Sequence, residues 1–213
     1  MKADKEISKA TIGRLPLYLR FLQEASANGE RFISSSVIAQ SISVSSVLVR
    51  KDLSVISSRE GVPRKGFGVA TLIADIEKFL GYDNLSDVVI VGAGGLGKAF
   101  LGYEGFKNNG MNIVAAFDKN TDLVGDAVAG KPILPMDDFR QFVEEHKIRV
   151  GIIAVPKVAA QEVLDEMVAA GVKAVWNFAP ASLVAPKDVI LKTEDLAASL
   201  SIVAAERFKR TEE

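Results

Sequence analysis

The sequence predicts an α/β protein of two domains, a small helical domain followed by an open, mostly parallel sheet with helices on both faces. Two observations predict this division. Residues 1–82 show three helical patterns with serine-rich starts and then a glycine-rich segment, without alternation of strands and helices. From Ser86 onward, apolar strand segments alternate with helical segments, the pattern of a doubly wound sheet. We expect the domain boundary between Tyr82 and Leu85.

Two helices are expected before residue 44. The first is expected from about residue 15 to residue 25, with Leu15, Leu19 and Leu22 on one face and Pro16 near its start. Serines 34–36 can cap the second, a short helix that ends near Ser43.

The third helix, about Val44 to Ile56, has two different faces. Val49, Leu53 and Ile56 share an apolar face, and the opposite face carries Val47, Arg50, Lys51 and Ser54. Arginine and lysine can contact guanine edges or phosphates, serine can hydrogen-bond to either, and an aliphatic group can touch a thymine methyl. The pattern therefore indicates a helix-turn-helix with a recognition helix; a solvated surface is the alternative.

A basic hairpin favours the DNA-binding interpretation. Residues 61–69 read GVPRKGFGV, which predicts a glycine-rich hairpin with Arg64 and Lys65 at its tip. Three helices and such a hairpin form a winged helix. A further helix is expected from Thr71, as its cap, to Gly81, with an apolar stripe of Leu72, Ile76, Phe79 and Leu80. The candidate DNA-binding residues are Ser45, Ser46, Val47, Arg50, Lys51, Ser54, Arg59, Arg64, Lys65 and Gly66.

A glycine-rich turn opens the second domain. Residues 88–100 read VVIVGAGGLGKAF, which places Gly92, Gly94 and Gly97 between a strand and a helix. In this G-x-G-x-x-G arrangement the first glycine turns the chain, the second lets the backbone approach a pyrophosphate, and the third lets helix and strand pack closely. Asp118 ends the next strand, where a carboxylate accepts hydrogen bonds from a ribose diol and repels a 2′-phosphate. We therefore expect a Rossmann-type domain that binds NAD(H).

The remaining elements follow in order. The helix from Leu96 is expected to reach Tyr103 and Gly105. Further strands are expected near residues 131–134, 149–155, 174–178 and 189–192, with a helix capped by Asp137 or Asp138 and another over residues 159–171. Residues 154–156 and 177–180 lie at strand ends, where ligands bind in such sheets.

Composition restricts the function classes. The 213 residues include 26 basic and 27 acidic side chains, so nucleic-acid binding must depend on a local patch. Cysteine is absent, which excludes disulfides, thiolate nucleophiles and cysteine metal sites, and no metal site is expected. The N-terminus has no apolar signal region and no segment is apolar enough to span a membrane, so a cytoplasmic location is expected.

Two other functions fit a glycine turn of this kind. A small NAD-dependent oxidoreductase would need an acid or base beside the nicotinamide, and the one histidine, His146, is expected on a polar helix end. Once the winged helix is assigned, no room remains for a substrate domain, so no catalytic residue is expected. A CoA-binding module is the other alternative, and Asp118 argues against it because it serves a free ribose.

Distinctive segments are spread over nearly the whole chain: RLPLYLR at 14–20, ISSS at 33–36, VRKDLSVI at 49–56, GVPRKGFGV at 61–69, VGAGGLGKAF at 91–100, GYEGF at 102–106, FD at 117–118, AVP at 154–156 and NFAP at 177–180. With these segments the chain resembles the Rex family of bacterial redox-sensing transcriptional repressors. The chain departs from the family pattern at Val69, where a tyrosine is usual, and at Gly95, where an asparagine is usual.

The resemblance implies a homodimer that holds palindromic operator DNA when NADH is scarce and releases it when NADH binds. It implies a winged-helix domain at 1–82, a Rossmann domain at 83–193, and a C-terminal helix at 194–213 that is swapped between subunits. It further implies a switch in which Asp195 bonds to Tyr103 in one state and to Arg20 in the other. The expected cofactor-binding residues are Gly92, Ala93, Gly94, Gly95, Leu96, Gly97, Tyr103, Asp118, Lys119, Ala154, Val155, Pro156 and Phe178.

The C-terminal segment can also be interpreted from its residues alone. Leu196, Leu200, Val203 and Ala204 form an apolar stripe on an amphipathic helix over residues 194–210. Such a stripe must be buried, either on the chain's own sheet or, as the resemblance implies, in a second subunit.

Overall fold

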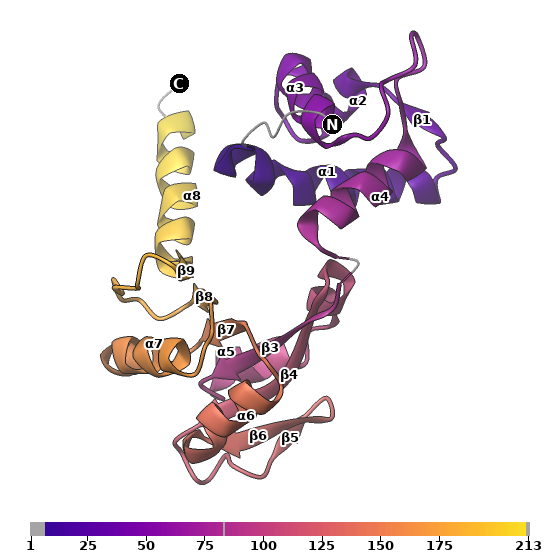
Figure 1. Cartoon of the computed structure of the whole chain (residues 1–213). Coiled ribbons are helices and arrows are strands. Elements are labelled where there is room, and N and C mark those ends of the chain that lie inside the picture. Colours follow the sequence, from indigo (N-terminus) through magenta and orange to yellow (C-terminus); the bar gives the residue numbers. More distant parts are fainter. Residues whose placement is uncertain (1–6, 83, 212–213) are drawn as a thin grey trace. The chain divides into compact units, whose positions relative to one another are not determined.

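The computed structural model describes residues 7–82 and 84–211, with the backbone alone for residues 208–211. The chain divides into two compact units after Asn84 (Figure 1). The first six residues, on which the expected absence of a signal peptide depends, lie outside the described residues. Among the described helices, none combines the length and apolar character needed to cross a membrane.

The N-terminal unit consists of helices packed around a small apolar core. Its elements are α1 Lys9–Ala27, β1 Phe32–Ile33, α2 Ser35–Ser41, α3 Ser46–Ile56, β2 Phe67–Gly68 and α4 Val69–Leu80. The core is formed by Leu15, Tyr18, Leu22, Ile38, Val49, Leu53, Leu72 and Ile76. The helical periodicity therefore predicted the buried face of α1 and part of those of α3 and α4, where Ile56 and Leu80 are only half-buried.

Helix α1 begins earlier than expected. The hydroxyl of Ser8 accepts the N–H of Thr11 at 3.1 Å and caps the helix before Lys9. Pro16 therefore lies inside the helix and not near its start. The apolar pattern does not reveal the capping serine. The helix that it caps includes Pro16, which has no backbone N–H to donate.

Helix α4 also begins earlier, at Val69. Its cap is Gly68, without a side-chain hydrogen bond, so the predicted cap at Thr71 is wrong. Strand β2 ends directly at this helix, which leaves no residue for a separate turn. Phe79 is 40% exposed, so the buried stripe is narrower than predicted. The expected end is confirmed, because Gly81 has the left-handed conformation (φ +73°) of a helix C-cap.

The glycine-rich segment forms the expected hairpin. The N–H of Val62 donates to the carbonyl of Gly66 at 2.7 Å, and the N–H of Gly66 donates back at 2.9 Å. Arg64 and Lys65 lie between these two residues, at the tip. The hairpin continues into β2, which pairs with β1. Gly66 has φ +87°, and a Cβ there would collide with the backbone of Ile33, so this glycine is needed to build the wing.

The C-terminal unit contains, within the described residues, a seven-stranded sheet in the order β5-β6-β4-β3-β7-β8-β9. The strands are β3 Ser86–Val91, β4 Met111–Asp118, β5 Ala127–Val128, β6 Lys131–Pro135, β7 Val150–Ile153, β8 Ala174–Asn177 and β9 Ile190–Thr193. All neighbouring pairs are parallel except β5 and β6. The chain runs from β3 outward to β6 and then returns beside β3 at β7, so the predicted doubly wound sheet is confirmed.

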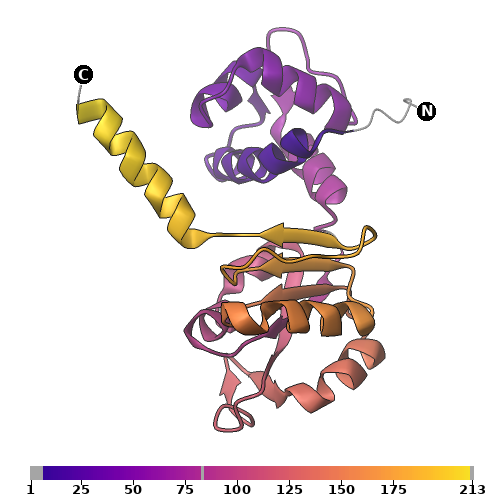
Figure 2. The ribbon, with the colours of Figure 1, turned by 90° about the vertical axis from the view of Figure 1, so that its left-hand side faces the viewer.

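Helices cover both faces of this sheet (Figure 2). They are α5 Gly95–Leu101, η1 Glu104–Asn109, η2 Met136–Asp138, α6 Phe139–Glu145, η3 Lys157–Ala159 and α7 Ala160–Ala169. Val89 and Val91 of β3 share a core with residues of α6 and α7, whereas Val88 and Ile90 share the other core with Leu101 of α5. The alternation along β3 thus gives each face its own core.

Two helix ends in this unit differ from the predicted ones. Helix α5 ends at Leu101 with Gly102 as its cap, so it does not reach Tyr103, which has extended backbone angles before η1. Asp138 occupies the N-cap position of α6 but makes no side-chain capping bond. The predicted aspartate cap is therefore wrong, because the turn η2 precedes α6 directly.

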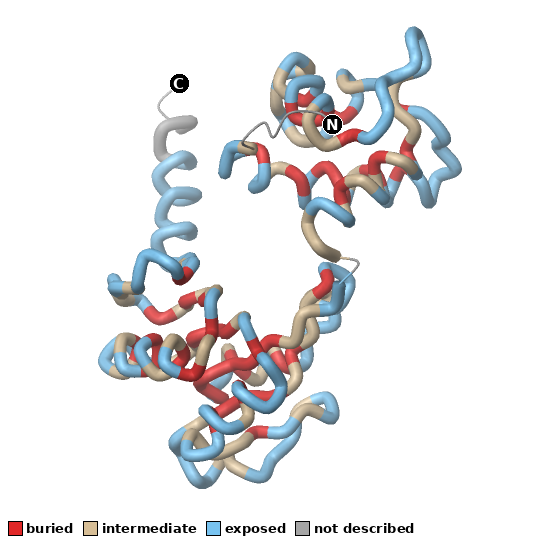
Figure 3. Tube along the Cα trace, viewed as in Figure 1, coloured by how far each residue is buried: buried red, intermediate tan, exposed pale blue. Residues whose placement is uncertain are grey.

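In helix α8, Leu196–Thr211, the residues up to 207, whose burial the structure describes, are exposed (Figure 3). The exposed fractions are 60% for Leu196, 70% for Leu200, 61% for Ile202 and 63% for Val203. The alternative in which this stripe packs on the chain's own sheet is therefore wrong.

Candidate functional site

The glycine turn after β3 has the geometry that each glycine was expected to provide. Gly92 has φ +103°, and a Cβ there would collide with the carbonyl of Ala154 on the neighbouring strand end. A Cβ on Gly97 would collide with the carbonyl of Gly92, because helix α5 passes directly over the turn. A Cβ on Gly94, at the N-cap of α5, would have no protein atom within 4 Å. Gly95 is equally open, and this side of the turn is the one expected to face a pyrophosphate.

Asp118 holds this turn in place from the end of β4. Its Oδ2 accepts the N–H of Ala93 at 2.7 Å, and its Oδ1 accepts the N–H of Asn120 at 2.8 Å. A carboxylate has about four lone-pair directions, so two bonds leave capacity for a ribose diol. The acid therefore serves the loop in addition to its expected role at the ribose.

A cleft of about 490 Å³ lies at the carboxyl ends of β3, β4, β6 and β7. The predicted cofactor residues that line it are Gly92, Gly94, Asp118, Lys119, Ala154, Val155 and Pro156. Gly95, Leu96 and Gly97 form the first turn of α5, and Ala93 is buried behind the glycine turn. An open glycine cradle, a helix N-terminus and an acid at the neighbouring strand end fit a dinucleotide.

Tyr103 and Phe178 lie outside this cleft, in an aromatic cluster on the α5 face of the sheet. Tyr103 contacts Phe106 with ring centroids 5.0 Å apart, and Phe178 contacts Trp176 at 4.4 Å and Phe100 at 4.8 Å. Phe100 and Trp176 were not predicted as site residues. Phe178 at the end of β8 and Tyr103 after α5 lie too far apart in sequence for any local pattern to associate them.

The cleft also contains two acids that sequence reasoning missed, Glu162 and Glu166. The pKa of Glu166 is raised above its usual value, chiefly by burial. The negative charges of Glu162 and Asp137 add to this effect, and the positive charge of Arg140 partly opposes it. Their spacing of one helical turn, in the helix that follows AVP and η3, was the available signal. His146 lies outside the cleft, at the end of α6, where its Nδ1 is 2.9 Å from the carbonyl oxygen of Phe142.

The outer face of α3 is exposed as predicted. Val47 is 65% exposed, and Arg50, Lys51 and Ser54 are exposed beside it. Two of the predicted serines already have local partners, since Ser45 Oγ accepts the N–H of Leu48 at 3.2 Å and Ser54 Oγ donates to the carbonyl of Lys51 at 2.8 Å. Ser45 is the cap of α3, and Ser46 is its first residue.

The basic residues of the wing are exposed. Arg59 and Arg64 are exposed, and the ammonium of Lys65 lies 5.8 Å from the ring centroid of Phe32. The winged-helix unit therefore presents cations on both the recognition helix and the hairpin, although the chain as a whole has a net charge of −1.

The three predicted switch residues are exposed. Arg20 lies on α1, Tyr103 precedes η1, and Asp195 Oδ1 accepts the N–H of Ala198 at 2.8 Å as the cap of α8. Within the described part of the C-terminal unit, no hydrogen bond joins Tyr103 to Asp195. In the same part of the chain, no cluster of acidic or histidine side chains could hold a metal ion.

A winged-helix unit with an exposed basic face, joined to a Rossmann unit with a dinucleotide-type turn, defines a class of DNA-binding regulators that respond to a nucleotide cofactor. A family model described as "CoA binding domain" matches residues 83–181, and one described as "Putative DNA-binding protein N-terminus" matches residues 6–54. The chain belongs to the Rex family of redox-sensing transcriptional repressors.

Curated relatives and solved structures support the assignment to the Rex family. The chain is 38% identical to the redox-sensing transcriptional repressor Rex of Treponema denticola, over 95% of this chain and 96% of that protein. It is 42% identical to Rex of Desulforamulus reducens over the same shares. The Rex-family repressor RSP is 34% identical, and its complex with NAD⁺ and operator DNA superposes with a TM-score of 0.88 over 98% of both chains. The NADH complex of RSP gives a TM-score of 0.86 over 98% of this chain and 100% of that one.

Proposed function

We propose that this protein is a homodimeric repressor that holds palindromic operator DNA through its winged helix and releases it when NADH occupies the Rossmann cleft. The observation that carries this proposal is the presence, in one chain, of an open glycine cradle beside Asp118 and an exposed basic recognition helix. The solved RSP complexes with NAD⁺ plus operator DNA and with NADH support it. Such a repressor acts on the chromosome, so we place it in the cytoplasm.

In this proposal the cofactor is held by the residues that the sequence assigns to it. The N–H groups at the start of α5, Gly95 to Gly97, face the pyrophosphate, while Gly94 allows its close approach. Asp118 binds the ribose diol, and together with Glu162 and Glu166 it disfavours a 2′-phosphate. Tyr103 and Phe178 belong to the aromatic cluster that would face the nicotinamide. The nicotinamide ring is cationic in NAD⁺ and neutral in NADH. An apolar surface favours the neutral ring, because it avoids burying a charge.

DNA contact is assigned to α3 and the wing: Ser45, Ser46, Val47, Arg50, Lys51 and Ser54 from the helix, and Arg59, Arg64, Lys65 and Gly66 from the hairpin region. Bases are read by the helix, whereas the wing residues meet phosphates. We refer below to a selected operator, a palindromic duplex that the protein enriches from a randomised pool, and to a shuffled duplex of the same composition.

Arg50 and Arg64 are expected to differ in their effect. Arg50→Ala should weaken binding to the selected operator by about 1 to 3 kcal/mol and leave the shuffled duplex nearly unaffected. Arg64→Ala should weaken both duplexes alike and lower the salt slope by about 1, because it removes one phosphate contact. Salt titrations of both duplexes measure the difference. Equal losses on both duplexes for Arg50→Ala would make Arg50 a phosphate contact.

The proposed switch assigns Asp195 to Tyr103 in one state and to Arg20 in the other. Since Asp195 also caps α8, Asp195→Asn is the appropriate variant, because asparagine caps helices equally well. This variant should bind NADH normally and yet retain the operator at NADH concentrations that release the wild type. Asp188→Asn, which removes another exposed acid of the same unit, is the control. Operator release at the wild-type NADH concentration would contradict the switch.

A titration tests the function as a whole. The purified protein bound to the selected operator is titrated with NADH and, separately, with NAD⁺ and CoA at fixed salt. NADH should release the DNA and be recovered unoxidised, and a near-complete switch requires a preference of about 5 kcal/mol for the DNA-free state. Oxidation of NADH with any small substrate would support the oxidoreductase alternative, and release by CoA alone would support the CoA-binding alternative.

A further inference from the structure

The recognition helix carries an acid on its buried side. Asp52 follows Arg50 and Lys51, yet its side chain is only 3% exposed, beside Val49 and Leu53 in the core. A negative charge so close to the proposed DNA surface opposes phosphate binding. A buried carboxylate is also costly unless it is paired and hydrogen-bonded. The hydrogen-bond partners of Asp52 therefore have to account for an acid at this position.

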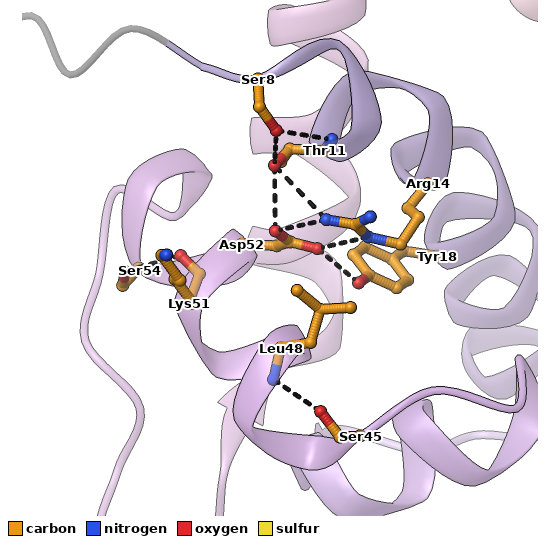
Figure 4. A network of polar contacts seen from close by, with 9 residues as sticks. All are labelled: Ser8, Thr11, Arg14, Tyr18, Ser45, Leu48, Lys51, Asp52 and Ser54. Carbon is orange, nitrogen blue, oxygen red and sulfur yellow. Dashed lines mark hydrogen bonds and ion pairs between the residues drawn. The ribbon is translucent and has the colours of Figure 1, made fainter.

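Among the described residues, every side-chain partner of Asp52 belongs to α1 (Figure 4). Oδ1 accepts Thr11 Oγ1 at 3.1 Å and Arg14 Nη2 at 2.9 Å, and Oδ2 accepts Arg14 Nε at 2.8 Å and Tyr18 Oη at 2.7 Å. Thr11, Arg14 and Tyr18 share one face of α1, since their spacings are three and four residues. These bonds use the full acceptor capacity of the carboxylate.

The charges of this cluster are fixed near neutral pH. Burial raises the pKa of Asp52, but the hydrogen bonds from Arg14, Tyr18 and Thr11 outweigh burial and hold that pKa below its usual range. Burial and the bond to Asp52 raise the pKa of Tyr18 to about 12. Asp52 is therefore charged and Tyr18 protonated throughout the physiological range, so the four bonds stay formed.

Directional bonds fix what apolar packing leaves free. The packing of Val49 and Leu53 holds α3 in the core, but dispersion and hydrophobic burial are not directional and tolerate small rotations of the helix. A rotation of about 10° moves atoms on the helix surface by about 1 Å. A bidentate arginine fixes both the position and the plane of its carboxylate. The four bonds to Asp52 restrict the rotation of α3, the helix that also carries Arg50 and Lys51.

We propose that Asp52 is a positioning residue for operator recognition, which locks the rotation of α3 by binding Thr11, Arg14 and Tyr18 of α1. This inference rests on the proposed function, because it concerns base contacts made by α3. It concerns specificity: a loosened α3 still presents its cations to phosphates but no longer holds them in register with base edges.

The test compares affinities for the selected operator and the shuffled duplex at fixed salt, well below the unfolding temperature. Asp52→Asn is expected to lose about tenfold on the selected operator and to change less than about twofold on the shuffled duplex. Tyr18→Phe keeps the ring in the core and removes one bond, so a loss of about threefold on the selected operator is expected. Glu24→Gln, which removes an exposed charge from α1, is the matched control and should keep the ratio of the two affinities.

The sign of the effect separates positioning from charge. Removing a negative charge alone would strengthen binding to both duplexes, so a loss confined to the selected operator has another cause. An unchanged ratio in Asp52→Asn and Tyr18→Phe, or equal losses on both duplexes with a lowered unfolding temperature, would show that the cluster only stabilises the fold. If Asp52→Asn does not fold, Tyr18→Phe decides alone. Failure of the proposed function is distinguishable, because the wild type would then enrich no duplex.

Discussion

Gly94→Ala is expected to fold like the wild type and to bind NADH about 100-fold more weakly, a loss of about 2.8 kcal/mol. Gly94 has φ −69°, which any residue adopts, and a Cβ there meets no protein atom within 4 Å. The free protein therefore tolerates alanine. The added methyl occupies the space through which a pyrophosphate would approach the N–H groups of α5, and each bond to a charged group contributes about 1.5 to 3 kcal/mol. Isothermal titration with NADH measures the loss, and thermal unfolding without cofactor checks the fold.

Gly97→Ala provides the contrast on the same turn. A Cβ on Gly97 would collide with the carbonyl of Gly92, so the turn or α5 must move, and overpacking of this kind costs about 1 to 3 kcal/mol of stability. This variant should therefore lose both thermal stability and NADH affinity, whereas Gly94→Ala loses affinity alone. Normal NADH binding by Gly94→Ala would exclude this turn as the pyrophosphate site.

The elements predicted best are those fixed by neighbours in sequence. Gly92, Gly94 and Gly97 lie in the predicted strand-turn-helix because apolar β-branched residues, a glycine turn and a helix follow one another directly. The same holds for the wing, whose hairpin is determined by the glycines and the proline within residues 61–69. In both places neighbouring residues predict the backbone, and contacts with distant residues, Gly92 with Ala154 and Gly66 with Ile33, add a second reason for glycine.

The features that were missed depend on contacts between distant residues. Asp52 shares the helical phase of Val49 and Ile56, so its burial was readable, but its partners lie at positions 11 to 18 of another helix. The start of α1 depended on one serine hydroxyl. Tyr103 and Phe178 meet other aromatic side chains through the fold of the sheet, which no spacing reveals. Periodicity gives the faces of helices, and tertiary packing selects the partners.

The replacement of Leu200 and Val203 of α8 by glutamate is expected to produce a monomer that binds NADH but has lost operator affinity by about 100-fold or more. Both side chains are more than 60% exposed in the single chain, so their replacement removes no contact within the protomer. In the proposed dimer they are buried against the second subunit, where the negative charges of the two glutamates would have to be desolvated at a cost. Operator affinity falls because each winged helix then binds its half-site independently, without the high effective concentration that a linked partner provides.

Ser201→Glu is the matched control for this variant. Ser201 is exposed on the same helix but lies outside the stripe of Leu196, Leu200 and Val203, so a charge there should leave the dimer intact. Sedimentation equilibrium gives the oligomeric state, and operator titration gives the affinity. A dimer that survives both glutamates would place the subunit interface elsewhere on the Rossmann unit. A monomer with undiminished operator affinity would instead mean that one winged helix reads the site alone, because affinity would then not depend on linking two half-sites.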